Sequence, residues 1–241
     1  MRSLALSAAL AASPAIADDS GFVEANLLGI FHHELGHAVI HIEDVPIFAQ
    51  EEDAADVFSI FLIDAFWEEQ DAEALAYQAA IGFWAEAMSR DSEGDTIAWW
   101  DTHSPDERRF YNTVCIFYGA NPEARSQFAS DLDLPEERAE YCPEEYDQAG
   151  ASWGAVIDEM IERGSGDSFR LISDGDSLTE QLLKDEVTAL NAEMSLSQPL
   201  EISVESCGEA NAFYDPQTIS VIMCLEFEDH LIALEKLLND D

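Results

Sequence analysis

The sequence predicts an α+β fold that is mainly helical and includes a small antiparallel sheet or hairpin. In several long segments, apolar residues recur every three or four positions, as on amphipathic helices. Near the end of the chain, EISVESC and TISVIMCLEF alternate in polarity and are rich in Ile and Val, as strands are. The chain has 241 residues, enough for a hydrophobic core, and we expect one domain over residues 18–241.

The first 17 residues resemble a secretory signal peptide. One early arginine precedes a short run of small and apolar residues, and Ala15-Ile16-Ala17 forms an A-x-A cleavage site before Asp18. This pattern predicts a secreted or periplasmic protein. A buried N-terminal helix is the alternative.

Seven helices are expected, separated by proline, glycine or polar stretches. In chain order they span residues 21–42, 51–67, 72–88, 106–118, 144–163, 178–194 and 226–238. The segment RGSGDSFRLISDGDS, residues 163–177, is crowded with Gly, Ser and Asp, and we expect a linker or long loop there.

The two strand-like segments flank DPQT, a turn signal that predicts a β-hairpin. Such a hairpin places Cys207 and Cys224 nearly opposite each other, close enough for a disulfide. The four cysteines include no Cys-x-x-Cys pair, which disfavours a thiolate zinc site or a redox motif. Of the three possible pairings we favour Cys207 with Cys224 and Cys115 with Cys142.

The charge balance restricts the partners. The chain has 51 Asp and Glu against 10 Lys and Arg, a net charge of −41. Such a surface repels phosphate backbones and anionic lipids, so we expect no nucleic-acid partner. Apart from solubility, the acidity indicates no function. After the signal, no apolar run is long enough for membrane insertion.

The motif His33-Glu34-Leu35-Gly36-His37 lies within the first expected helix. Positions four apart lie on one helix face, so both imidazoles can reach one tetrahedral Zn2+ ion. Glu34 then lies beside the ion and is the candidate general base. The alternative is two histidines on a solvated helix face.

A zinc peptidase needs a third protein ligand. His41 continues the histidine stripe, but at about 1.5 Å per residue it lies roughly 12 Å from His33, too far to share one ion. His32 points off the stripe, so we expect neither histidine to bind the metal. Glu43 has the spacing of the metzincin ligand, without the glycine needed to turn the chain back.

Glu52 is the favoured third ligand. The stretch Glu52-Asp53-Ala54-Ala55-Asp56 resembles the Glu-x-x-x-Asp segment of gluzincins, in which the glutamate binds zinc and the aspartate orients a ligand histidine. Asp56 lies one helical turn after Glu52, on the same face. The alternative for this stretch is a solvated acidic patch.

Further stretches extend the resemblance. HELGHAVI with EEDAAD, DERRFYNTVCIFYG with LPEERAEYC, and CGEANAFYDP with VIMCLEFE resemble a family of bacterial metallopeptidases whose function is not characterised. The resemblance implies a zincin-like, zinc-dependent peptidase fold and no particular substrate. In that family the CGEANAFYDP-like hairpin precedes the His-Glu-x-x-His helix, so the motif order here is similar to a circular permutation.

These observations predict a zinc peptidase that cleaves a peptide or protein substrate with metal-activated water. His103 and Tyr111, in family-like stretches, are candidates for stabilising the oxyanion. The hairpin either supplies an edge for an extended substrate or only completes the sheet. A non-catalytic metal-binding or protein-interaction domain with the zincin fold is the alternative function, and hydrolysis of a non-peptide amide is a third. The oligomeric state is not predicted.

Overall fold

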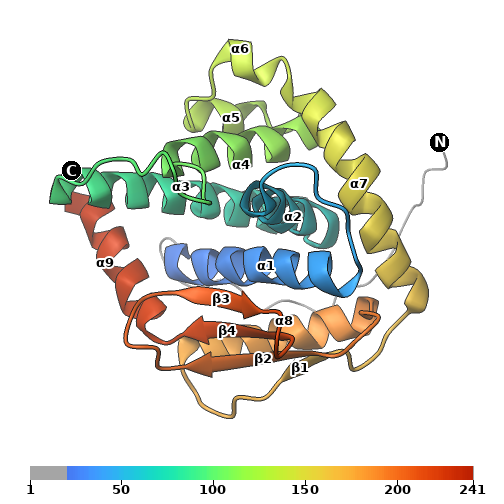
Figure 1. Cartoon of the computed structure of the whole chain (residues 1–241). Helices are drawn as coiled ribbons and strands as arrows, with labels where there is room; N and C mark the ends of the chain where they lie inside the picture. Colours follow the sequence, from blue (N-terminus) through green and yellow to red (C-terminus); the bar gives the residue numbers. More distant parts are fainter. Residues whose placement is uncertain (1–20, 241) are drawn as a thin grey trace.

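The computed structural model describes residues 21–240 and shows a mainly helical chain with a small mixed sheet, which confirms the α+β class (Figure 1). The signal-peptide prediction for residues 1–17 lies outside the described residues. The helices are α1 (Phe22–Ile42), α2 (Glu51–Phe66), α3 (Glu69–Glu93), α4 (Asp106–Ala120), α5 (Ser126–Asp131), α6 (Glu136–Ala139), α7 (Cys142–Arg163), α8 (Leu178–Glu193) and α9 (Glu226–Asp240).

Helix α1 runs through the middle of the molecule (Figure 1). The sheet and α8 lie on one side of it, and α2 and α3 lie on the other. Its side chains are therefore buried almost all round. Gly36 lets α2 come close, because a Cβ there would lie 3.0 Å from the Cα of Ala55. This approach brings the start of α2 against the histidines of α1.

The four strands are β1 (Phe169–Leu171), β2 (Leu200–Glu205), β3 (Ala212–Asp215) and β4 (Ser220–Cys224), in the order β1-β2-β4-β3. Strands β3 and β4 form an antiparallel hairpin around the DPQT turn. The expected antiparallel pairing of the two longer segments is wrong, because β2 and β4 pair in parallel. Along the chain, β3 comes after β2 and before β4 and runs in the opposite direction, so β4 has the same direction as β2. Strand β3 is left at the edge, beside α1.

The segment expected to be a long loop contains β1. Its three residues, FRL, pair in parallel with β2, and Phe169 is buried in the core. Three residues between Gly- and Ser-rich flanks are too few to show a strand pattern. The short helices α5 and α6 were also not predicted.

Both predicted disulfides are confirmed. Cys115 and Cys142 are bonded with Cα atoms 5.1 Å apart, and Cys207 and Cys224 with Cα atoms 5.5 Å apart. The second bridge forms because parallel β2 and β4 end together, with Glu205 opposite Cys224. Two disulfides indicate an oxidising, extracytoplasmic compartment.

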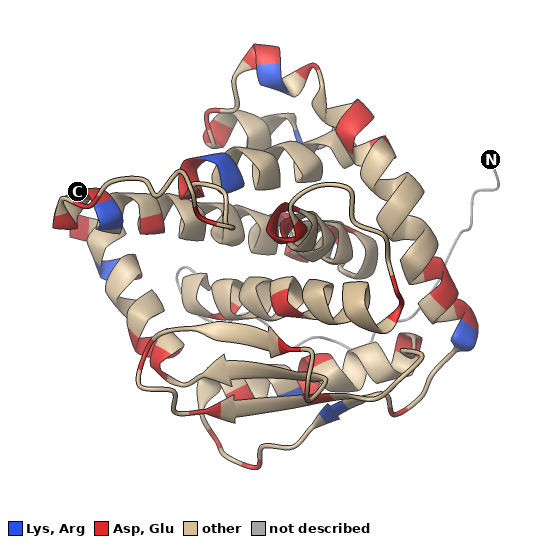
Figure 2. Cartoon of the chain, in the orientation of Figure 1, with Lys and Arg blue, Asp and Glu red and all other residues tan. Residues whose placement is uncertain are grey.

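Acidic residues are spread over most helices and connecting segments, whereas basic residues are few (Figure 2). None of the helices within residues 21–240 is long and apolar enough to cross a membrane.

Candidate metal centre

The two histidines of the His-Glu-x-x-His motif lie one turn apart on α1, as their spacing predicts. Both are buried, and their Nε2 atoms are 3.2 Å apart. The imidazoles of His33 and His37 therefore converge on one point.

Glu52, in the first turn of α2, completes this group. Its Oε2 lies 3.2 Å from His33 Nε2 and 3.1 Å from His37 Nε2. With bonds of about 2.0–2.1 Å, a tetrahedral zinc ion spaces its ligand atoms about 3.3 Å apart. The three donors thus match the type and spacing of a zinc site.

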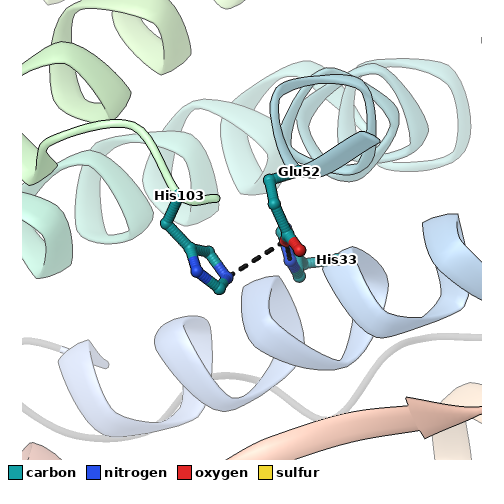
Figure 3. A group of neighbouring side chains, drawn as sticks. All are labelled: His33, Glu52 and His103. Carbon is teal, nitrogen blue, oxygen red and sulfur yellow. Dashed lines mark hydrogen bonds and ion pairs between the residues drawn. The ribbon is translucent and has the colours of Figure 1, made fainter. Parts of the chain in front are cut away.

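His103 approaches the same oxygen from the segment between α3 and α4, with its Nε2 3.0 Å from Glu52 Oε2 (Figure 3). His33, Glu52 and His103 form a group whose donor atoms all lie within 4.8 Å of one another, and such a group could hold a metal ion. The structure therefore brings four of the predicted site residues together.

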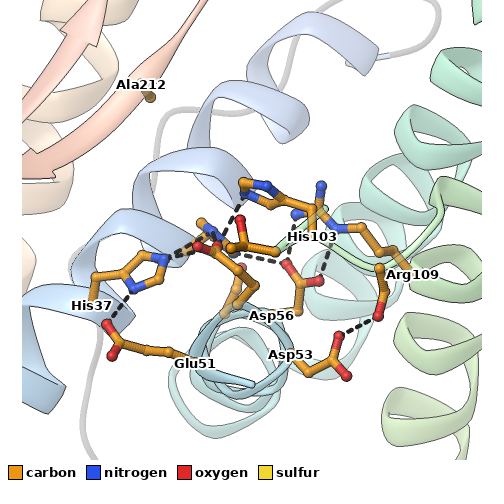
Figure 4. Close-up of polar contacts among 12 residues, drawn as sticks. His37, Glu51, Asp53, Asp56, His103, Arg109 and Ala212 are labelled. Carbon is orange, nitrogen blue, oxygen red and sulfur yellow. Dashed lines mark hydrogen bonds and ion pairs between the residues drawn. The ribbon is translucent and has the colours of Figure 1, made fainter. Parts of the chain in front are cut away.

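His33 and His37 each contact a second carboxylate through the other ring nitrogen (Figure 4). His33 Nδ1 lies 2.7 Å from Asp56 Oδ1, and His37 Nδ1 lies 2.9 Å from Glu51 Oε1. Ionised carboxylates only accept hydrogen bonds, so both Nδ1 atoms carry the proton. Each Nε2 can then donate a hydrogen bond to Glu52 when its ring is protonated, or present a lone pair to a metal ion when the ring is neutral. The sequence predicted Asp56 in this role and missed Glu51.

Arg109 of α4 holds Asp56 in place. Its Nε and one terminal nitrogen donate to the two Asp56 oxygens at 2.8 and 2.7 Å, and its guanidinium lies 4.2 Å from the Phe83 ring centre. A bidentate pair fixes the plane of the carboxylate, and therefore the direction of its bond to His33. Sequence reasoning missed Arg109, because nothing in DERR distinguishes it from Arg108.

The carboxylates beside these histidines stabilise positive charge at the centre. Burial lowers the pKa of His33, but hydrogen bonds to Asp56 and Glu52 outweigh it and raise that pKa to about 9. Hydrogen bonds from His103, His33 and His37 hold the pKa of Glu52 far below its usual value. Protons supply the positive charge in the metal-free protein, and a divalent cation would replace them.

Glu34 is buried beside this group and borders the cavity. Burial raises the pKa of its carboxyl, partly offset by the nearby histidines and by a hydrogen bond from the backbone N–H of Tyr214. Tyr214 belongs to edge strand β3, and its hydroxyl lies 2.6 Å from His41 Nδ1. Sequence reasoning missed Tyr214.

A cavity of about 1090 Å³ opens onto the centre and runs between α1, α2, α3 and β3. All the residues of the centre border it. Tyr111 does not: it packs against Phe110, with ring centres 5.0 Å apart. Glu43 also lies elsewhere, in an ion pair with Arg163 at 2.6 Å.

Comparison with known proteins places the chain in a family. Residues 11–157 and 173–236 match the model of the family DUF4344, which is described as "Putative metallopeptidase". No curated protein and no solved structure gives a significant match. The matched residues cover most of the chain and include every residue of the centre, so the chain belongs to the family DUF4344.

Proposed function

We propose that this protein is an exported zinc peptidase in which His33, His37 and Glu52 bind Zn2+ and Glu34 is the general base. One observation carries the proposal: two imidazole nitrogens and a carboxylate oxygen lie 3.1–3.2 Å from one another beside a buried carboxyl group. When bound, zinc would supply Lewis-acid activation of water and of the scissile carbonyl. The cavity gives a substrate access to this point.

Glu34 would move the protons of the reaction. Its carboxylate would take a proton from the attacking water and later deliver it to the leaving amine. A raised pKa supports both steps, because the group then accepts and releases a proton nearer to neutral pH. The backbone N–H of Tyr214 orients the carboxylate.

His103 is the candidate donor to the oxyanion. It borders the cavity and contacts Glu52, so a carbonyl held beside the three ligands would lie near its imidazole. For Tyr111 the structure offers no such support, since its ring packs away from the cavity.

The substrate would be a peptide in extended form. Strand β3 pairs with β4 along one side, and its residues Ala212 to Tyr214 border the cavity. Figure 4 shows Ala212 on the strand that faces the centre. A peptide can add to such an edge through backbone hydrogen bonds. This role requires only that the hairpin and the helical part fold together, as in the single domain that we propose over residues 18–241.

Metal analysis combined with a peptidase assay tests the proposal. We expect about one zinc ion per purified chain, peptidase activity that a chelator abolishes, and recovery on adding zinc. A protein that binds zinc yet cleaves no peptide from a diverse library, with or without chelator, would instead support a non-catalytic metal-binding domain.

A further inference from the structure

We propose that His103 is a fourth metal ligand in the substrate-free protein, and that it leaves the metal when substrate binds. The proposal rests on the zinc site proposed above and concerns its resting state. A site with four protein ligands is closed to substrate, whereas a catalytic site keeps one position open. His103 would therefore act as a latch: it occupies the fourth coordination position until substrate binding displaces it.

The contacts of His103 repeat those of the other two histidines. Each imidazole directs its Nε2 to Glu52 Oε2, at 3.2 Å for His33, 3.1 Å for His37 and 3.0 Å for His103. Each also has a carboxylate beside its Nδ1, which for His103 is Asp101 at 3.5 Å. A carboxylate on Nδ1 is the usual partner of a metal-binding histidine.

Hydrogen bonding to Glu52 alone does not account for this arrangement. The Nε2 atoms of His33 and His37 are only 3.2 Å apart, so two N–H groups aimed at one oxygen would crowd each other. A cation beside Glu52 would instead be met by the lone pairs of these nitrogens. The donor atoms of His33, Glu52 and His103 all lie within 4.8 Å of one another, which is close enough for the three residues to hold one metal ion.

His103 is also less enclosed by the protein than the other two histidines, so it can leave the metal more easily. Its side chain is 48% exposed, against 9% for His33 and 11% for His37. It projects from the segment between α3 and α4, which begins at Gly94 with a φ of 79° and presents the indoles of Trp99 and Trp100 to solvent. Moving this imidazole disturbs no core packing.

One contact keeps the released imidazole nearby. The adjacent Ser104 donates a hydrogen bond to Asp53 of α2 at 2.6 Å, which ties the segment to the helix that carries Glu52. After leaving the metal, His103 would remain within reach of the substrate carbonyl. The same side chain would then bind the metal before substrate arrives and donate to the oxyanion afterwards.

X-ray absorption spectroscopy of the zinc-loaded full chain tests the resting state directly. We expect three imidazole ligands in the wild type and two in both His103→Ala and His103→Gln. His41→Ala is the matched control, because His41 borders the same cavity without approaching Glu52, and it should retain three. Zinc affinity should fall by at least about tenfold in the His103 variants only.

A small anion provides a second readout. In the cobalt-substituted protein, azide should alter the visible spectrum at lower concentration in His103→Ala than in the wild type, because the fourth position is already open. Only two imidazole ligands on the wild-type zinc, with equal azide affinity in the wild type and His103→Ala, would contradict His103 as a fourth ligand. The proposed peptidase site would be unaffected by that result. A wild-type chain that binds no zinc or cobalt would overturn the site itself.

Discussion

The neighbouring histidines His32 and His33 lie on opposite faces of α1 and have different surroundings. His33 contacts Asp56 and Glu52 and borders the cavity. His32 faces the core, where its Nε2 lies 2.8 Å from an oxygen of Glu186. Both are buried and both meet a carboxylate. A buried histidine–carboxylate pair is therefore no sign of a metal centre by itself. What distinguishes the His33 face is the convergence of several donors on one accessible point.

The largest effect should come from Glu52, where the donors converge. In Glu52→Gln a neutral amide replaces the charged ligand, so we expect zinc to dissociate readily and peptidase activity to fall to background. Glu43→Gln is the matched control and should keep both, since Glu43 pairs with Arg163 away from the cavity. Zinc content after dialysis measures metal retention, and a peptidase assay measures activity. Zinc loss from Glu43→Gln with retention in Glu52→Gln would reverse the ligand assignment.

A smaller effect is expected behind the ligands, at Arg109. Arg109→Lys keeps the charge but loses the bidentate pair of hydrogen bonds to the Asp56 carboxylate. We expect about tenfold weaker zinc binding, measured by competition with a chromogenic chelator. Arg108→Lys is the control, because Arg108 is exposed and contacts Asp53 instead. Equal zinc affinity in all three proteins would show that Arg109 does not orient His33 through Asp56.

On the core face, a change should affect stability and not the metal. Glu186→Ala removes the partner of buried His32, and we expect the free energy of unfolding to fall by about 1–3 kcal/mol. Zinc affinity should stay at the wild-type value. Urea unfolding and the chelator competition test the two halves of this prediction. A clear loss of zinc affinity would mean that the two faces of α1 are coupled.

The smallest effect concerns a carboxylate remote from both faces. Backbone and hydroxyl hydrogen bonds from Ser206, Cys207 and Gly208 lower the pKa of Glu226 from 4.5 to about 2. A lowered pKa stabilises the fold above pH 4.5, and this contribution is lost as the pH falls toward 2. The melting temperature of Glu226→Gln should therefore depend less on pH between 4.5 and 2 than that of the wild type. Identical pH profiles would contradict this.

The parts of the centre that follow from local spacing could be predicted from the sequence. His33, His37 and Glu34 share one helix, and Glu52 and Asp56 share the next, so helical periodicity alone places each pair. Arg109 and Tyr214 could not be found in this way. They reach the site through packing of α4 against α2 and of β3 against α1, which no local pattern encodes.

The sheet illustrates the same limit. Strand character was evident in the Ile- and Val-rich segments, but their parallel pairing depends on β3, which lies between them in the chain. The disulfide between Cys207 and Cys224 was predicted from a hairpin that pairs differently, and it forms because both strands end at the same level. The circularly permuted motif order stays a prediction.

The most direct test of the account is the substitution Glu34→Gln, because it separates the base from the ligands. The amide keeps the shape of the side chain and cannot accept the proton. We expect wild-type zinc content by metal analysis, together with a fall in peptidase turnover of about a hundredfold or more. Turnover within tenfold of the wild type at full zinc content, or loss of the zinc itself, would contradict the assignment of Glu34 as the general base.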